Sequence, residues 1–219
     1  PHNHLYKNLQ NGTFKEVSKE AGVDGPWYSM GITVGDINND GYPDIYLSNY
    51  GKNTLYLNKG DGTFKDITDK SGIGGGEQCS VGAVWLDYDN DGLLDIYVGN
   101  YLNFDPDYSY YYAPDGFPGP LAYDSQKDIL FRNKGDGTFE DVTEQMGIVD
   151  IDGRAMGVGA ADYDDDGFVD IYVANDHTVN FLWHNDQGQG FSDQGTLSGT
   201  GFSQAGEATV SMSVDFADY

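Results

Sequence analysis

The chain has 219 residues, of which 36 are acidic and 11 are basic, and its formal net charge is −25. This balance excludes nucleic acid as a partner, since no cluster of Lys and Arg is available to displace the counterions of phosphate groups. The single cysteine, Cys79, allows neither an internal disulfide nor a cysteine-based zinc site. No stretch is long and apolar enough to predict a membrane span.

A turn motif of Asn, Gly and Phe between two strand-like runs is the first element along the chain. It occurs at residues 8–14, 58–64 and 133–139, with a looser copy at 185–191. An Asn or Asp followed by Gly is typical of a hairpin turn, because both residues tolerate positive φ. We expect the phenylalanine that ends each copy to pack in the core between neighbouring repeats. These residues are Phe14, Phe64, Phe139 and Phe191.

A nine-residue acidic loop alternates with this turn and leads directly into an apolar, strand-like run. It occurs at 36–44, 87–95 and 162–170, with oxygen-bearing side chains at positions 1, 3, 5 and 9 and glycine at position 6. Alternate residues of a tight loop can point their oxygens at one centre, and hard oxygen ligands suit Ca²⁺. We therefore predict about three Ca²⁺ sites, one in each whole repeat. The expected side-chain ligands are Asp36, Asn38, Asp40 and Asp44, then Asp87, Asp89, Asp91 and Asp95, then Asp162, Asp164, Asp166 and Asp170.

A single loop of this kind is equally well explained as a solvated acidic turn. Three copies with the same spacing, glycine and exit strand favour cation binding instead. An EF-hand is excluded, because the twelfth position of each loop is apolar and lies in the predicted strand. The first loop has Asn38 where the others have Asp89 and Asp164, so we expect it to bind Ca²⁺ most weakly.

The two motifs divide the chain into repeats of four short antiparallel strands with glycines in the innermost strand. This pattern predicts an all-β fold, a β-propeller with four-stranded antiparallel blades, present as about four blades of one domain over 1–219. Half-repeats are expected at 1–25 and 205–219, and whole repeats at 26–73, 74–149 and 150–204. Residues 212–217 are expected to form the innermost strand of the last half-repeat.

The second whole repeat contains an insertion, residues 101–126, that is rich in Tyr, Phe and Pro. Such residues provide contact area at low entropic cost, as binding surfaces do. We expect a contact surface for a protein or a glycan, with Tyr110–Tyr112 stacking on a sugar, or a lid that caps its own blade. The open edges of a partial propeller also predict contact with further blades or self-assembly with a second chain.

Together, the acidic loops and turns resemble the FG-GAP/VCBS repeats of integrin-α-like β-propellers. Residues 113–120 and 173–182 resemble the ASPIC/UnbV (cartilage acidic protein-like) group, although the strict Phe-Gly and Gly-Ala-Pro signatures are missing. The resemblance implies a seven- or eight-bladed propeller with Ca²⁺ in the blade loops, secreted or on the cell surface. It also implies that the backbone carbonyl at loop position 7 is a ligand, which adds Tyr42, Leu93 and Phe168.

The predicted function is a calcium-binding extracellular module, not an enzyme, that serves as a structural, adhesion or assembly surface. The alternatives are a carbohydrate-binding propeller and a propeller enzyme of the lyase or dehydratase type. The sequence contains no nucleophile elbow, P-loop or His-Glu-x-x-His motif, and we assign no catalytic residue. For the enzyme alternative, the ionisable residues outside the acidic loops would be Asp176, His177, His184 and Glu207.

Overall fold

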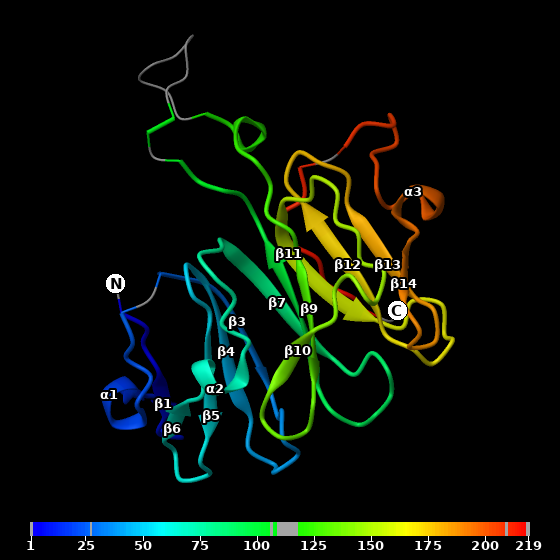
Figure 1. Cartoon of the computed structure of the whole chain (residues 1–219). Coiled ribbons are helices and arrows are strands. Elements are labelled where there is room, and N and C mark those ends of the chain that lie inside the picture. Colours follow the sequence, from blue (N-terminus) through cyan, green and yellow to red (C-terminus); the bar gives the residue numbers. More distant parts are fainter. Residues whose placement is uncertain (1, 27, 106, 109–117, 209, 218–219) are drawn as a thin grey trace.

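The computed structural model describes residues 2–26, 28–105, 107–108, 118–208 and 210–217. Within these residues, the strands form one two-stranded and three four-stranded antiparallel sheets. The predicted all-β architecture of propeller blades is confirmed (Figure 1). Among the described residues, no helix has the length and apolar character needed to cross a membrane.

Each four-stranded sheet is built from strands that follow one another in sequence. The two-stranded sheet contains β1 (Tyr6–Asn8) and β2 (Phe14–Glu16). The next contains β3 (Tyr28–Gly35), β4 (Asp44–Tyr50), β5 (Thr54–Asn58) and β6 (Phe64–Asp66). It is followed by β7 (Ser80–Leu86), β8 (Asp95–Asn100), β9 (Ile129–Asn133) and β10 (Phe139–Asp141). The last contains β11 (Ala155–Ala161), β12 (Asp170–Asn175), β13 (Phe181–Asn185) and β14 (Phe191–Asp193).

Short helical turns follow the outermost strands of three sheets. They are α1 (Ser18–Ala21), α2 (Thr68–Ser71) and α3 (Gly195–Ser198), and each ends at a glycine in the left-handed region. A 3₁₀ turn, η1 (Pro120–Ala122), lies in the insertion.

The first strands of the three large sheets, β3, β7 and β11, lie side by side near the centre of the molecule (Figure 1). Each of them contains one bulge at the same place in its register with the second strand. A Cβ atom on Gly157 of β11 would lie 2.8 Å from the Cα of Ser213, so only glycine allows this approach. Small residues are therefore required where the blades crowd together.

Residues 212–217 run beside β11, but no strand is assigned to them, so the prediction of an innermost strand there is wrong as stated. The Ser211 N–H donates to the Asn175 carbonyl, at 3.1 Å between nitrogen and oxygen. The side chains of Val214 and Phe216 lie against Gly159. The segment thus occupies the place beside β11 that β11 itself occupies beside β7, without the regular hydrogen bonding of a strand.

Apolar side chains fill the space between successive sheets. Phe139 packs with Tyr46 between the second and third sheets, and Phe191 packs with Tyr88 between the third and fourth. Phe64 is partly buried against the core that joins β1 and β2 to the second sheet. Phe14 is 63% exposed, so its predicted core position is wrong. It lies on the two-stranded sheet, whose strand residues are all exposed.

The first strand of the second sheet, β3, has an apolar face that is exposed. Ile32 and Val34 of β3 are 66% and 55% exposed. Ala83 and Trp85 hold the corresponding positions of β7, as the pairing of each strand with its neighbour shows. Both pack on the core between the second and third sheets. The exposed face of β3 is therefore the face that a preceding sheet covers elsewhere in the molecule.

The two ends of the insertion are anchored to the last sheet. The Arg154 guanidinium donates to the carbonyl oxygens of Tyr123, at 3.0 Å, and Pro120, at 3.3 Å. The Tyr101 hydroxyl donates to the Asp176 carboxylate, at 2.7 Å between oxygens. The described parts of the insertion thus join the third sheet to the fourth. The predicted sugar-stacking residues, Tyr110–Tyr112, lie outside the described residues.

Cys79, just before β7, lies beside the start of the insertion, since the Tyr101 N–H donates to the Cys79 carbonyl at 2.9 Å. It is a free, buried thiol, and burial raises its pKa. Its N–H donates to the side-chain oxygen of Gln126, at 2.6 Å. A buried thiol with a raised pKa is a poor nucleophile, so we assign Cys79 a structural place only.

Candidate metal centres in the acidic loops

The sequence pattern of each acidic loop is explained by its own backbone hydrogen bonds. In the second loop, the Asp87 carboxylate accepts the N–H groups of Asp91, at 3.0 Å, and Gly92, at 2.9 Å. The Asp91 carboxylate in turn accepts the N–H of Leu93, at 2.9 Å. Gly92 has a φ of 86°, in the left-handed region that glycine tolerates best.

The first and third loops repeat the same bonds from position 1 and position 5. The Asp36 carboxylate accepts the N–H groups of Asp40 and Gly41, and the Asp162 carboxylate accepts those of Asp166 and Gly167. The Asp40 carboxylate accepts the N–H of Tyr42, and the Asp166 carboxylate accepts that of Phe168. Position 4 has positive φ in all three loops, where Asn39, Asn90 and Asp165 stand. Asn and Asp are the non-glycine residues that adopt this conformation most readily.

The aspartate at position 9 fastens each loop to its sheet. Asp95 is fully buried, and its two carboxylate oxygens accept the N–H groups of Asn133, at 2.7 Å, and Tyr88, at 3.3 Å. Burial and, as a smaller cause, the charges of Asp89 and Asp91 raise the pKa of Asp95 to about 7. Asp44 and Asp170 are also fully buried at the same position, and burial raises their pKa values too.

Carboxylate oxygens converge in the second and third loops. One oxygen each from Asp87, Asp89 and Asp95 lie within 4.8 Å of one another, and the same holds for Asp162, Asp164 and Asp170. In the described part of the chain, the first loop forms no such group of three carboxylates. There the Asn38 amide nitrogen donates to the Asp40 carboxylate, at 2.9 Å.

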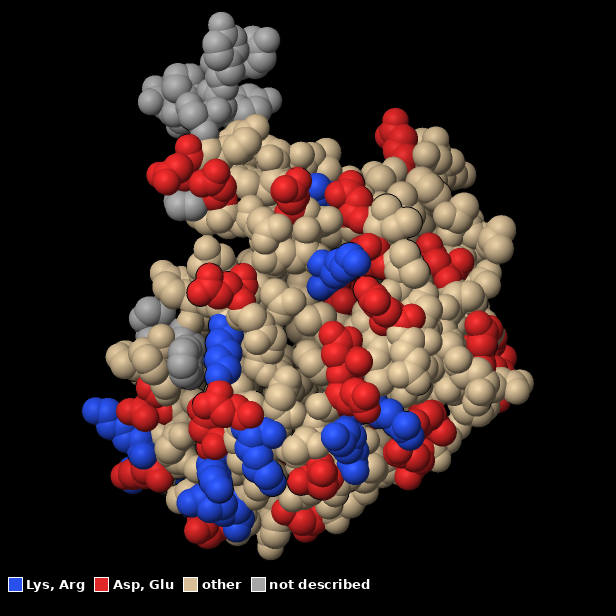
Figure 2. All heavy atoms as spheres, in the orientation of Figure 1, with Lys and Arg blue, Asp and Glu red and all other residues tan. Residues whose placement is uncertain are grey.

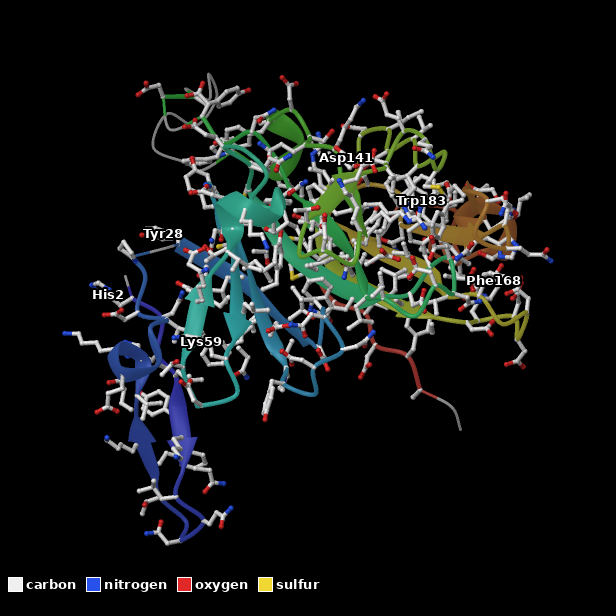
Figure 3. The ribbon with its side chains drawn as sticks, turned by 60° about the horizontal axis from the view of Figure 1, so that its bottom comes forward. His2, Tyr28, Lys59, Asp141, Phe168 and Trp183 are labelled. Carbon is white, nitrogen blue, oxygen red and sulfur yellow. The ribbon has the colours of Figure 1, made fainter. Side chains whose placement is uncertain are left out.

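These donor sets fit Ca²⁺. Carboxylates crowded at this distance repel one another, and a bound divalent cation removes that repulsion. The Oδ1 atom of Asp89 is buried and has no hydrogen-bond partner among the described residues, as expected for an atom that awaits a ligand. If Ca²⁺ binds, positions 1, 3, 5 and 9 of each loop would hold it. Phe168, at position 7 of the third loop, marks one side of the molecule in Figure 3.

The structure also shows that successive loops are joined, which the sequence analysis missed. The Asn39 amide donates to the Gly92 carbonyl, at 2.9 Å, and the Asn90 amide to the Gly167 carbonyl, at 3.1 Å. The Asn133 amide donates to the carbonyl of Ile37 in the preceding loop, at 2.8 Å. The asparagine that opens the third and fourth turn motifs, Asn133 and Asn185, was a signal that could have indicated part of this linkage.

Each loop has a different neighbour on the third strand of its sheet. Leu57, Arg132 and His184 occupy equivalent positions, one residue before the turn asparagine. Arg132 forms an ion pair with Asp89. His184 Nδ1 lies 3.2 Å from Asp170 Oδ1 and 3.5 Å from Asp164 Oδ2. The sequence analysis assigned neither residue to a loop, since strand register decides the contact.

The candidate residues for an enzyme do not assemble into one site. His184, in β13, lies beside the third acidic loop. Its Nδ1 is 3.2 Å from Oδ1 of Asp170, which starts β12. His177 follows the end of β12, with its Nε2 3.9 Å from Asp176 Oδ1. Glu207 is exposed in the segment after α3.

Acidic side chains are spread over the whole face shown in Figure 2, whereas most Lys and Arg side chains lie over its lower half. Acidic and basic side chains alternate in that half, so this face carries no continuous basic patch. A continuous basic surface is the electrostatic footprint of nucleic-acid binding. This face therefore lacks that footprint.

Comparison with known proteins places these observations in a family. The FG-GAP-like repeat model matches residues 2–47, 36–98 and 115–173, which together exceed half of the chain. Cartilage acidic protein 1 of Mus musculus is 27% identical over 185 residues, covering 81% of the chain and 25% of that protein. The Xenopus tropicalis and Homo sapiens proteins of the same name are each 39% identical over 67 residues, or 26% of the chain and 10% of theirs.

The chain thus spans a quarter or less of the length of these relatives. Among solved structures, the chain is similar to a lectin of Agrocybe aegerita, described for its specific recognition of non-reducing terminal N-acetylglucosamine. The alignment covers 87% of this chain and 45% of the lectin chain, at 19% identity and a TM-score of 0.44. On the match of its repeats, the chain belongs to the FG-GAP-like repeat family.

Proposed function

We propose that the chain is a calcium-stabilised, non-enzymatic module that presents an extracellular adhesion or assembly surface. The observation that carries this proposal is the convergence of three carboxylates within 4.8 Å in the second loop and again in the third. Carboxylates this close repel one another, a bound cation would offset that repulsion, and oxygen ligands favour Ca²⁺.

The ion would act as a clip between a loop and a sheet. Positions 1, 3 and 5 belong to the loop, while position 9 is buried at the start of the second strand, as Asp95 is. Because amide hydrogen bonds join one loop to the next, an ion that stiffens one loop also supports its neighbour. Ligands supplied within a single loop leave little room for a substrate, which favours a structural role.

The extracellular setting is supported by chemistry and by family membership. Calcium loops of extracellular modules typically bind with dissociation constants of about 10⁻⁴–10⁻³ M, matched to extracellular calcium. The relatives reported above carry the name cartilage acidic protein 1. Two surfaces are available for adhesion or assembly: the insertion anchored by Arg154 and the exposed apolar face of β3.

The ligand assignment is tested by two substitutions that remove the same charge from the same loop. Asp164→Asn at position 3 gives the third loop the pattern of the first, and we expect it to weaken one calcium site about tenfold, a loss of about 1.4 kcal/mol. Asp165→Asn at position 4 gives the third loop the residue found at Asn39 and Asn90, and we expect no change. Calorimetric calcium titration measures both affinities.

Asp165 is a suitable control because asparagine already stands at this position in the second loop. There Asn90 donates a hydrogen bond to the Gly167 carbonyl of the neighbouring loop. Thermal unfolding with and without calcium provides the second readout, and only Asp164→Asn should reduce the stabilisation by calcium. Equal effects of the two variants would show that the loop attracts calcium through its net charge and not through defined ligands.

A further inference from the structure

A guanidinium group lies beside two of the side chains that the second loop is expected to use as cation ligands. Arg132 Nη2 is 2.7 Å from Asp89 Oδ2 and 3.4 Å from Asp91 Oδ2. The Asp89 side chain is only 15% exposed and Arg132 is 44% exposed, so the carboxylate end of the pair is partly shielded from water. Asp89 and Asp91 hold positions 3 and 5, two of the four side-chain ligand positions.

This arginine is peculiar to the second loop. The equivalent residue of the first loop is Leu57, which carries no charge, and that of the third is His184. The second loop has four carboxylates at its ligand positions, whereas the first has three and Asn38. With Arg132 included, the charge around the second loop equals that of the first, since four negative charges and one positive charge sum to −3.

We propose that Arg132 is a tethered counter-cation that holds the second loop in shape without calcium and competes with calcium for Asp89. When the ion is absent, the guanidinium offsets the repulsion between the carboxylates at positions 3 and 5. When the ion binds, Arg132 must leave Asp89 Oδ2 or remain beside a divalent cation of like charge. Either course weakens calcium binding.

This inference rests on the proposed calcium function and refines it. A count of charges within the loops alone ranks the first loop as the weakest site because of Asn38. When Arg132 on the neighbouring strand is counted, the expected calcium affinity of the second loop falls as well. Arg132 contacts the loop directly, at 2.7 Å from Asp89 Oδ2. The second loop would therefore keep its structure when calcium is low and bind the ion only after the third loop is filled.

The test is Arg132→Leu, which gives the second loop the neighbour of the first. We expect calorimetric titration to show one site with about tenfold tighter calcium binding. We also expect the thermal midpoint in chelator to fall by about 2–4 °C, because the carboxylates lose their counter-charge. Lys134→Leu is the matched control: it also removes one positive charge, in the adjoining turn, where the lysine charge acts on Asp136.

The effect is assigned to the second loop by repeating Arg132→Leu in an Asp89→Asn background, where it should no longer change calcium affinity. Arg132→Gln keeps a polar side chain of similar length and serves if the leucine variant fails to fold. If calcium binds the unaltered chain but Arg132→Leu and Arg132→Gln behave like Lys134→Leu, the role of Arg132 is overturned. If the unaltered chain binds no calcium at millimolar concentration, the proposed function itself fails.

Discussion

Replacing Asp95 by alanine is expected to reduce the free energy of unfolding by about 2–6 kcal/mol, with calcium and without it. The reason is that Asp95 stabilises the fold through its hydrogen bonds, in addition to its proposed role as a calcium ligand. Its two oxygens accept the N–H groups of Asn133 and Tyr88, and alanine would leave both donors buried without a partner. Each buried, unpaired donor costs about 1–3 kcal/mol.

Asp95→Asn separates these two contributions. The amide keeps one acceptor oxygen for the Asn133 N–H but loses the negative charge that calcium requires. We expect this variant to lose calcium-dependent stability while it retains more of its stability in chelator than the alanine variant does. Urea unfolding in chelator and in millimolar calcium measures all four values. A destabilisation of Asp95→Ala that appears only in calcium would contradict the structural part of this account.

Replacing Asp128 by asparagine is expected to stabilise the protein at pH 8. Asp128 lies between the third and fourth sheets, almost completely buried, and accepts the Asn100 N–H at 2.7 Å and the Tyr97 hydroxyl at 2.8 Å. The other two large sheets have Asn53 and Asn180 at this position, where the side-chain oxygen accepts the same backbone N–H. Asparagine is thus already compatible with this site in two of the three sheets.

The direction of the effect follows from the pKa of Asp128. Burial raises this pKa well above its usual range, and the nearby charge of Asp150 raises it further. A group with a higher pKa in the folded state binds its proton more tightly there, so its contribution to stability is full in acid and is lost as the pH rises toward the folded-state pKa. Asparagine is neutral throughout and avoids this loss.

We therefore expect Asp128→Asn to exceed the unaltered protein in unfolding free energy at pH 8. The difference should shrink as the pH falls toward 4. Urea unfolding across this pH range measures it. A difference that does not vary with pH would show that Asp128 is not a source of the pH dependence.

The local pattern of the sequence was sufficient to predict the blades and the loops. Gly92 and Asn90 need positive φ, and Asp87 and Asp91 bind the loop backbone, so nine residues define the loop shape by themselves. The strand pattern of the repeats likewise predicted the four-stranded sheets. These features depend on short-range interactions, which is why a single sequence reveals them.

Features that depend on a neighbouring sheet were not predictable in the same way. Phe14 repeats the core phenylalanine of the other turns but lies on a sheet that leaves it exposed. Residues 212–217 have the composition of an innermost strand, yet they run beside β11 without strand hydrogen bonding. The contact of Arg132 with Asp89 depends on strand register, since more than 40 residues separate the two in sequence.

The most direct test of the central claim is a calorimetric titration of the chain with calcium, with the thermal midpoint recorded at each step. The acidic loops predict three Ca²⁺ bound per chain at millimolar calcium, together with a rise of the midpoint that chelator reverses. Absence of binding at that concentration, or binding that leaves the midpoint unchanged, would contradict the view that calcium clips the loops of these blades to their sheets.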